Sequence, residues 1–155
     1  MGAFHGSRQA MFAALLLAAL AVPAMAQDQA APVAGILNGF GFFGTWAIQC
    51  GAQPSTANLV QTVTWTGREP VEYSVTFVPG TVGNRYRVVS AQMPDASTLL
   101  MQVQLNGNLT ENLTITKYGA DRIRTMSTQT WQGFLVKDGI VVASGHPTPW
   151  LQKCR

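Results

Sequence analysis

The sequence predicts an all-β protein, a single antiparallel β-barrel of about eight short strands, with a β-sandwich as the alternative. Three observations favour this fold class. Apolar and polar residues alternate with a period of two along most of the chain after residue 41. Turn-forming dipeptides separate the alternating segments. Two cysteines, Cys50 and Cys154, lie near the two ends of that region, so one disulfide can close it.

Residues 1–26 are expected to be a secretory signal peptide. Arg8 gives a weakly basic start, residues 11–22 are apolar, and Ala24-Met25-Ala26 fits the small-x-small cleavage rule. The apolar run is shorter than the roughly 20 residues that cross a bilayer, so no membrane span is expected after cleavage. The mature chain is therefore expected in the periplasm or outside the cell, where an oxidising environment favours a disulfide between the cysteines.

Residues 27–41 are rich in Ala, Gly and polar residues, and we expect a flexible lead-in there. Residues 42–155 form the barrel domain. The expected strands cover 42–50, 58–66, 71–78, 84–91, 98–105, 111–118, 121–128, 131–137 and 140–144.

Two dipeptides and the C-terminal segment complete the expected topology. Asn106-Gly107 and Asp138-Gly139 are typical of tight hairpins, because they tolerate positive φ. The segment 146–154 contains two prolines and is expected to be an extended or short helical tail rather than a central strand. This tail would bring Cys154 to Cys50, with Trp150 packed beneath the bond.

Composition and motifs argue against an enzyme, a metalloprotein and a nucleic-acid binder. Charged residues make up 11% of the chain, against roughly 25% in an average soluble protein, and they form no basic stripe. His146 is the only histidine after the signal peptide, and neither a G-x-S-x-G nor an H-E-x-x-H motif occurs. The seven acidic residues fall mostly at expected turns or outward faces. We therefore expect no catalytic residue, no metal and no cofactor.

Large apolar side chains on the expected inward faces are the candidate ligand-binding residues. They are Trp46, Trp65, Tyr73, Phe77 and Met101. An apolar cup in an eight-stranded barrel could hold one small hydrophobic ligand. Aromatic rings also fill small barrels efficiently, so core packing is the alternative for the same residues.

The segment FGTWAIQC at 43–50 carries two resemblances. Gly44-Thr45-Trp46 resembles the G-x-W motif of the calycin superfamily, the lipocalins and avidins. This resemblance implies an eight-stranded barrel with the Trp across its bottom, covered by an arginine, here Arg122 or Arg124. Trp46 and Cys50 also resemble the W-x-x-x-C element of invasion-associated protein B-like periplasmic proteins. The chain as a whole resembles small exported proteins of alphaproteobacteria, which implies a compartment and no activity.

These observations predict a non-enzymatic exported binding protein for a small hydrophobic ligand or an envelope protein. The alternative is an inhibitor of an exported hydrolase, a protease or a lysozyme, that inserts residues 27–41 into an active site. An outer-membrane barrel ranks last, because its strands would need about 9–11 residues and the expected ones are shorter. The sequence leaves the oligomeric state open.

Overall fold

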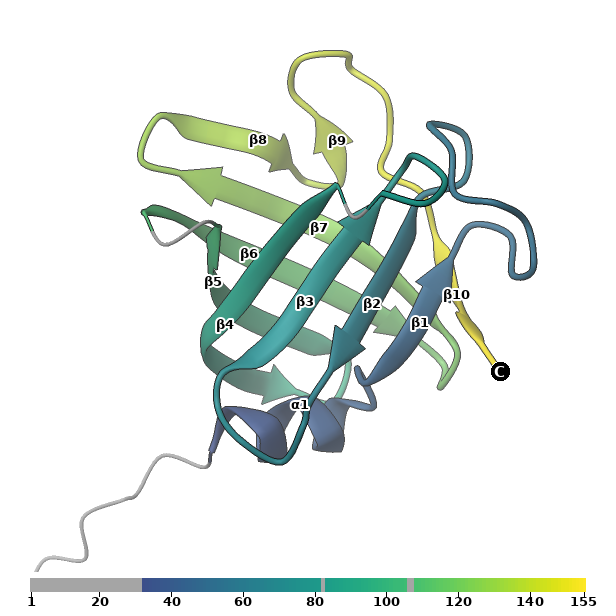
Figure 1. The fold of residues 1–155 in the computed structure, drawn as a ribbon. Coiled ribbons are helices and arrows are strands. Elements are labelled where there is room, and N and C mark those ends of the chain that lie inside the picture. Colours follow the sequence, from purple (N-terminus) through teal and green to yellow (C-terminus); the bar gives the residue numbers. More distant parts are fainter. Residues whose placement is uncertain (1–31, 82, 106–107) are drawn as a thin grey trace, which may run out of the picture.

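A computed structural model describes residues 32–81, 83–105 and 108–155. The expected signal peptide, residues 27–31 and the Asn106-Gly107 turn lie outside this part of the chain. Within it are one helix and ten strands (Figure 1). They are α1 (Val33–Phe40), β1 (Gly44–Ala47), β2 (Val60–Thr64), β3 (Val71–Thr76), β4 (Asn84–Asp95), β5 (Thr98–Leu105), β6 (Leu109–Tyr118), β7 (Arg122–Thr130), β8 (Gly133–Lys137), β9 (Ile140–Val141) and β10 (Leu151–Cys154).

The strands form a closed antiparallel barrel of eight strands, which confirms the expected fold class. Each strand from β1 to β7 pairs with the next along the chain, and β10 pairs with both β1 and β7 to close the ring. Strands β8 and β9 continue the sheet from β7 outside the ring (Figure 1). We call the end beneath which α1 lies in Figure 1 the lower end, and the opposite end the upper end.

The C-terminal segment differs from the expected tail, because its last residues form the closing strand β10. The two prolines, Pro147 and Pro149, both precede that strand, so every N–H of Leu151–Cys154 remains available for pairing. The disulfide between Cys50 and Cys154 is confirmed, with a Cα–Cα distance of 5.4 Å. It ties the chain just after β1 to the last residues of β10.

A helix replaces most of the expected flexible lead-in. In α1, Ala34, Leu37 and Phe40 are buried against the barrel, and their spacing of three places them on one helical face. Gly41 ends the helix in the left-handed region, with φ of 79°. At the other end, a Glu69 oxygen accepts the Ala34 N–H at 3.1 Å. Eight residues are too short for a helical period to be recognised in the sequence, which explains the error.

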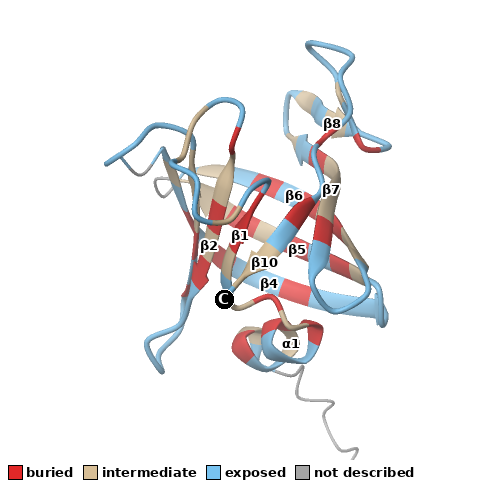
Figure 2. Ribbon diagram, turned by 90° about the vertical axis from the view of Figure 1, so that its right-hand side faces the viewer, coloured by how far each residue is buried: buried red, intermediate tan, exposed pale blue. Residues whose placement is uncertain are grey.

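The lower half of the barrel is filled with apolar side chains. The Phe40 and Phe42 rings meet edge to face at 6.2 Å, and the Trp46 indole N–H donates to the Phe42 carbonyl at 2.8 Å. Leu99 and Ile115 lie on paired strands in the same core and are almost completely buried. Figure 2 shows bands of buried residues along the strands and in α1, and the buried hydrophobic residues of the helix and the strands form one core. The helix and these side chains close the lower end.

The cation over Trp46 is not the one expected. Lys153 Nζ lies 5.2 Å from the Trp46 ring and donates to the Gly41 carbonyl at 2.8 Å. Arg122 and Arg124 lie instead over the ring of Trp150. That ring is partly exposed on the outer side, where it lies beside Tyr118 and the two arginines rather than beneath the disulfide. The arginines leave β7 outward, whereas Lys153 precedes the disulfide on β10.

Candidate functional site: a cavity in the upper half of the barrel

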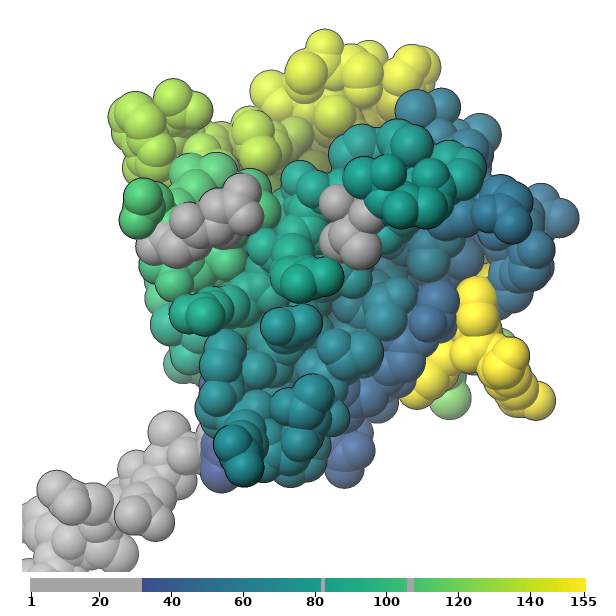
Figure 3. Space-filling view, in the orientation of Figure 1, coloured from purple at the N-terminus to yellow at the C-terminus, as the bar shows by residue number. Residues whose placement is uncertain are grey.

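The upper half of the barrel contains a cavity of about 340 Å³. Inward side chains of β2, β3, β4, β6 and β7 form its wall, while β8, β9 and residues 148–149 lie along its rim. In Figure 3 the yellow segment that follows β9 rises above the teal wall of β3 and β4. The volume falls in the range of about 300–1,000 Å³ that is usual for small-molecule sites.

Gln61 is a buried polar residue in the cavity wall. It shares the inner face of β2 with Val63, and its side chain is 5% exposed. Its amide oxygen, Oε1, has no hydrogen-bond partner anywhere in the described chain. A buried acceptor without a partner costs roughly 1–3 kcal/mol. The cavity therefore contains an acceptor that a bound donor could satisfy.

Glu111 is the charged residue of the cavity wall. It lies on the inner face of β6 opposite Val103 and is 6% exposed. Burial raises the pKa of its carboxyl group above the ordinary value. No described residue makes a hydrogen bond or an ion pair with this carboxylate. Gln61 Oε1 is the fully enclosed side-chain oxygen without a partner among the described residues, so the Glu111 carboxylate is partly desolvated and still reaches the open space of the cavity.

Two tyrosines lie beside Glu111 in the wall. The rings of Tyr73 and Tyr86 stack at 5.3 Å between centroids, and Asn84 Nδ2 donates to the Tyr86 hydroxyl at 3.1 Å. Burial raises the pKa of both phenols, and the charge of Glu111 raises them further. The electrostatic effect requires the carboxylate to be near both rings. Both tyrosines therefore stay protonated, and both line the cavity.

Backbone pairing of residues 146–148 with β9 and hydrogen bonds of the Thr148 side chain connect the rim. Above Leu151, β10 no longer pairs with β7, and Thr148 links the two sides: its hydroxyl donates to the Thr125 carbonyl at 2.6 Å. Arg124 donates to the Thr148 hydroxyl at 3.1 Å and to the Gly139 carbonyl at 2.8 Å. A Cβ at Gly139 would come within 2.9 Å of the Arg124 guanidinium. This network holds the β8–β9 turn at the cavity mouth.

The structure brings only one of the five predicted ligand-binding residues, Tyr73, to the cavity wall. Trp46 and Met101 are buried in the core but do not line the cavity. Trp65 and Phe77 are 50% and 36% exposed. Both would point inward if the strand alternation continued, but β2 ends at Thr64 and β3 at Thr76.

The two exposed aromatic residues pack outside the wall. Trp65 stacks on Phe43 at 6.3 Å between centroids. Phe77 lies against the backbone of the β3–β4 loop, where a Cβ on Gly83 would be 2.7 Å from its ring. Neither is a cavity residue.

Sequence reasoning missed Gln61 and Glu111, although a signal was present. Gln61 shares its face with Val63, and Glu111 shares its face with Leu113 and Ile115. The period-two pattern therefore placed both side chains inward. Their polar character favoured the opposite interpretation, an outward face or a turn.

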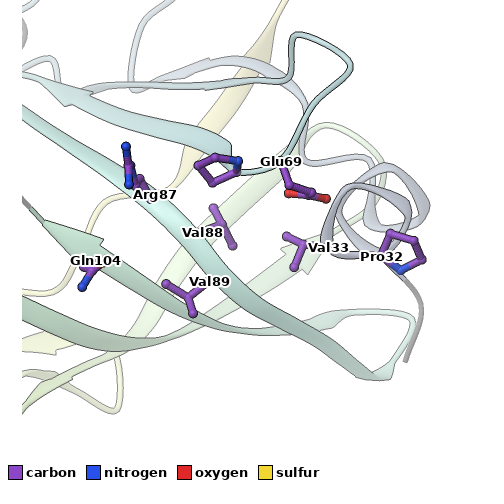
Figure 4. A pocket seen from close by; sticks show the side chains of 8 residues that line it. Pro32, Val33, Glu69, Arg87, Val88, Val89 and Gln104 are labelled. Carbon is purple, nitrogen blue, oxygen red and sulfur yellow. The ribbon is translucent and has the colours of Figure 1, made fainter. Parts of the chain in front are cut away.

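A second hollow, of about 410 Å³, lies outside the barrel between α1 and β4 (Figure 4). Pro32, Val33 and Val89 contribute apolar surface to it. Its acid, Glu69, is already engaged, since its two oxygens accept the N–H groups of Ala34 and Val71. This hollow is explained by the docking of the helix.

Other features of the described residues bear on cofactors and localisation. No three His, Cys, Asp or Glu side chains among them gather as a metal site would require, and His146 is exposed. Among the described residues, no helix is long and apolar enough to cross a bilayer. The disulfide is compatible with an exported protein.

Comparisons with known proteins give no relative. No protein family, no curated protein and no solved structure matches this chain. The barrel is therefore established by its own strand pairing, and its kinship with the calycins stays a prediction.

Proposed function

We propose that this protein is a non-enzymatic, exported binding protein that holds a small, mainly apolar ligand in its upper cavity. The observation that carries the proposal is the cavity itself, with the buried, unpartnered Gln61 oxygen in its wall. Leu59, Leu113 and Val136 supply apolar surface to the same cavity. Apolar walls with a few placed polar groups are typical of small-molecule sites.

Export to the periplasm or the medium belongs to the same proposal. The disulfide and the expected signal peptide support it. Inhibition of an exported hydrolase stays a prediction without support from the geometry, because residues 33–40 of the expected inserting segment are packed beneath the barrel as α1. An envelope partner likewise stays a prediction.

The experiment uses N-phenyl-1-naphthylamine, a neutral, non-basic dye whose fluorescence rises in apolar sites. We expect saturable binding to the purified wild-type protein. Thr128→Phe adds a ring to the cavity wall and should abolish the signal, whereas Gln129→Phe adds the same ring to the outer face of β7 and should not. Thermal unfolding shows whether each variant is folded.

A second measurement does not depend on a variant. Native mass spectrometry of protein purified from its own host should show a bound small molecule. Absence of both dye binding and a co-purified molecule would overturn the proposed function.

A further inference from the structure

The charge of the cavity limits what its ligand can be. Glu111 is the one residue with a formal charge among the described residues that line the cavity. Arg85 and Arg87 are exposed on the outer face of β4. Arg124 is held at the rim by Thr148 and Gly139. An anionic ligand would therefore face an acid with no cation beside it in the wall.

A neutral apolar ligand can fill the cavity but leaves the Glu111 charge without a partner. It would displace water from Glu111 and offer the carboxylate no partner, although burial already raises its pKa. Burying an unpaired charge is strongly unfavourable. The missing partner is a group that carries positive charge and donates hydrogen bonds.

The neighbours of Glu111 fit such a group. Tyr73 and Tyr86 line the same cavity, within electrostatic range of the carboxylate, and aromatic rings attract cations. Gln61 lies in the same cavity wall, 5% exposed, with an oxygen that lacks a donor. A carboxylate, aromatic faces and an amide oxygen together match an alkylammonium ion, which brings charge and several N–H donors.

We propose that the cavity binds a primary amine on a small apolar body, with the ammonium group paired to Glu111 and donating to Gln61 Oε1. This inference rests on the proposed function and names the chemical class of its ligand. The apolar wall around Leu113 receives the hydrocarbon part. A buried charge pair with hydrogen bonds on both sides then replaces an unpaired acid and an unpaired acceptor.

Three probes of similar size and different head groups test the inference: hexan-1-amine, hexan-1-ol and hexanoate, by calorimetric titration at pH 7. We expect the amine to bind wild-type protein at least about tenfold more tightly than the alcohol, and hexanoate to bind least. Glu111→Gln should remove the preference for the amine, and the variant should still bind hexan-1-ol. Glu72→Gln, an exposed acid on the outer face of β3, is the matched control and should keep the preference.

The outcomes separate this inference from the proposed function. If wild-type protein binds the dye and the alcohol but shows no preference for the amine, the ammonium inference is wrong and the binding function stands. A preference that survives Glu111→Gln, or tighter binding of hexanoate, overturns the inference in the same way. If neither the dye nor any probe binds, both proposals fail.

Discussion

The two halves of the barrel are built from the same strands and differ in what fills them. Below, Phe42, Trp46 and Leu99 pack with α1 into a closed apolar core. Above, Gln61 and Glu111 lie around a cavity. The change occurs within single strands: the inner face of β6 runs from apolar Ile115 and Leu113 to Glu111. Position along a strand therefore decides whether an inward residue packs in the core or lines the cavity.

The way in which β10 and β7 close the barrel also differs between the two halves. Strand β10 hydrogen-bonds to β7 only low in the wall, at the pairs of Leu151 with Ile123 and Gln152 with Arg122. Higher up, the Thr148 network replaces strand pairing. Elements that carry stability and elements that carry binding usually differ in local stability. We therefore expect lower-half changes to cost folding and upper-half changes to alter binding.

The largest expected effect comes from removing the disulfide that joins the chain after β1 to the end of β10. Replacing both Cys50 and Cys154 with serine removes a cross-link between residues 104 apart in sequence. The chain-entropy treatment gives a loss of about 5 kcal/mol in the free energy of unfolding. Urea unfolding under non-oxidising conditions measures it, and chemically reduced wild-type protein should lose a similar amount. A loss below about 1 kcal/mol would mean that the stability of the barrel does not depend on the disulfide.

A matched pair of truncations compares the two halves directly. Leu99 is fully buried in the lower core, whereas Leu113 borders the cavity. Leu99→Ala should cost about 3–4 kcal/mol and Leu113→Ala about 1–2 kcal/mol, because solvent or ligand can occupy the space that the second change leaves. Urea unfolding of both variants gives the comparison. Equal losses would mean that the upper half is as tightly packed as the lower half.

The sequence predicted the lower half's framework better than the upper half's chemistry. Alternation in segments such as 71–78, together with two cysteines, sufficed for the barrel and its disulfide, because strand pairing and cross-linking follow local patterns. The same pattern failed for Trp65 and Phe77, since it holds only while the strand lasts. Strand ends depend on tertiary contacts such as the stack of Trp65 on Phe43.

The cavity residues show a different limit. Gln61 and Glu111 have the correct period for inward residues, but a polar side chain on an inward face is costly and is normally assigned to solvent. Local rules fail where function outweighs stability. Only the folded structure shows that Glu111 lies within electrostatic range of Tyr73 and Tyr86.

The smallest expected effect is a gain in stability, from Glu111→Gln. The pKa of Glu111 lies above its usual 4.5 in the folded protein, so the unfolded chain releases its proton first as pH rises. Wild-type stability therefore falls relative to the variant between the unfolded and the folded pKa, and the deficit stays constant above both. The titratable side chains that face Glu111, Tyr73 and Tyr86, have raised pKa values and stay neutral in this range.

Thermal unfolding against pH measures this difference. At pH 7 the melting temperature of the variant should be a few degrees above that of wild type. This difference in melting temperature should disappear below about pH 4, where the side chain at position 111 is neutral in both proteins. Glu72→Gln on the outer face should show no comparable gap. Saturating hexan-1-amine should raise the wild-type melting temperature more than the variant's and so shrink the gap at pH 7. If the melting temperatures are equal or reversed without ligand, the Glu111 carboxylate already has favourable interactions in the folded protein. The lack of a partner for this acid would then no longer distinguish the upper half from the lower half.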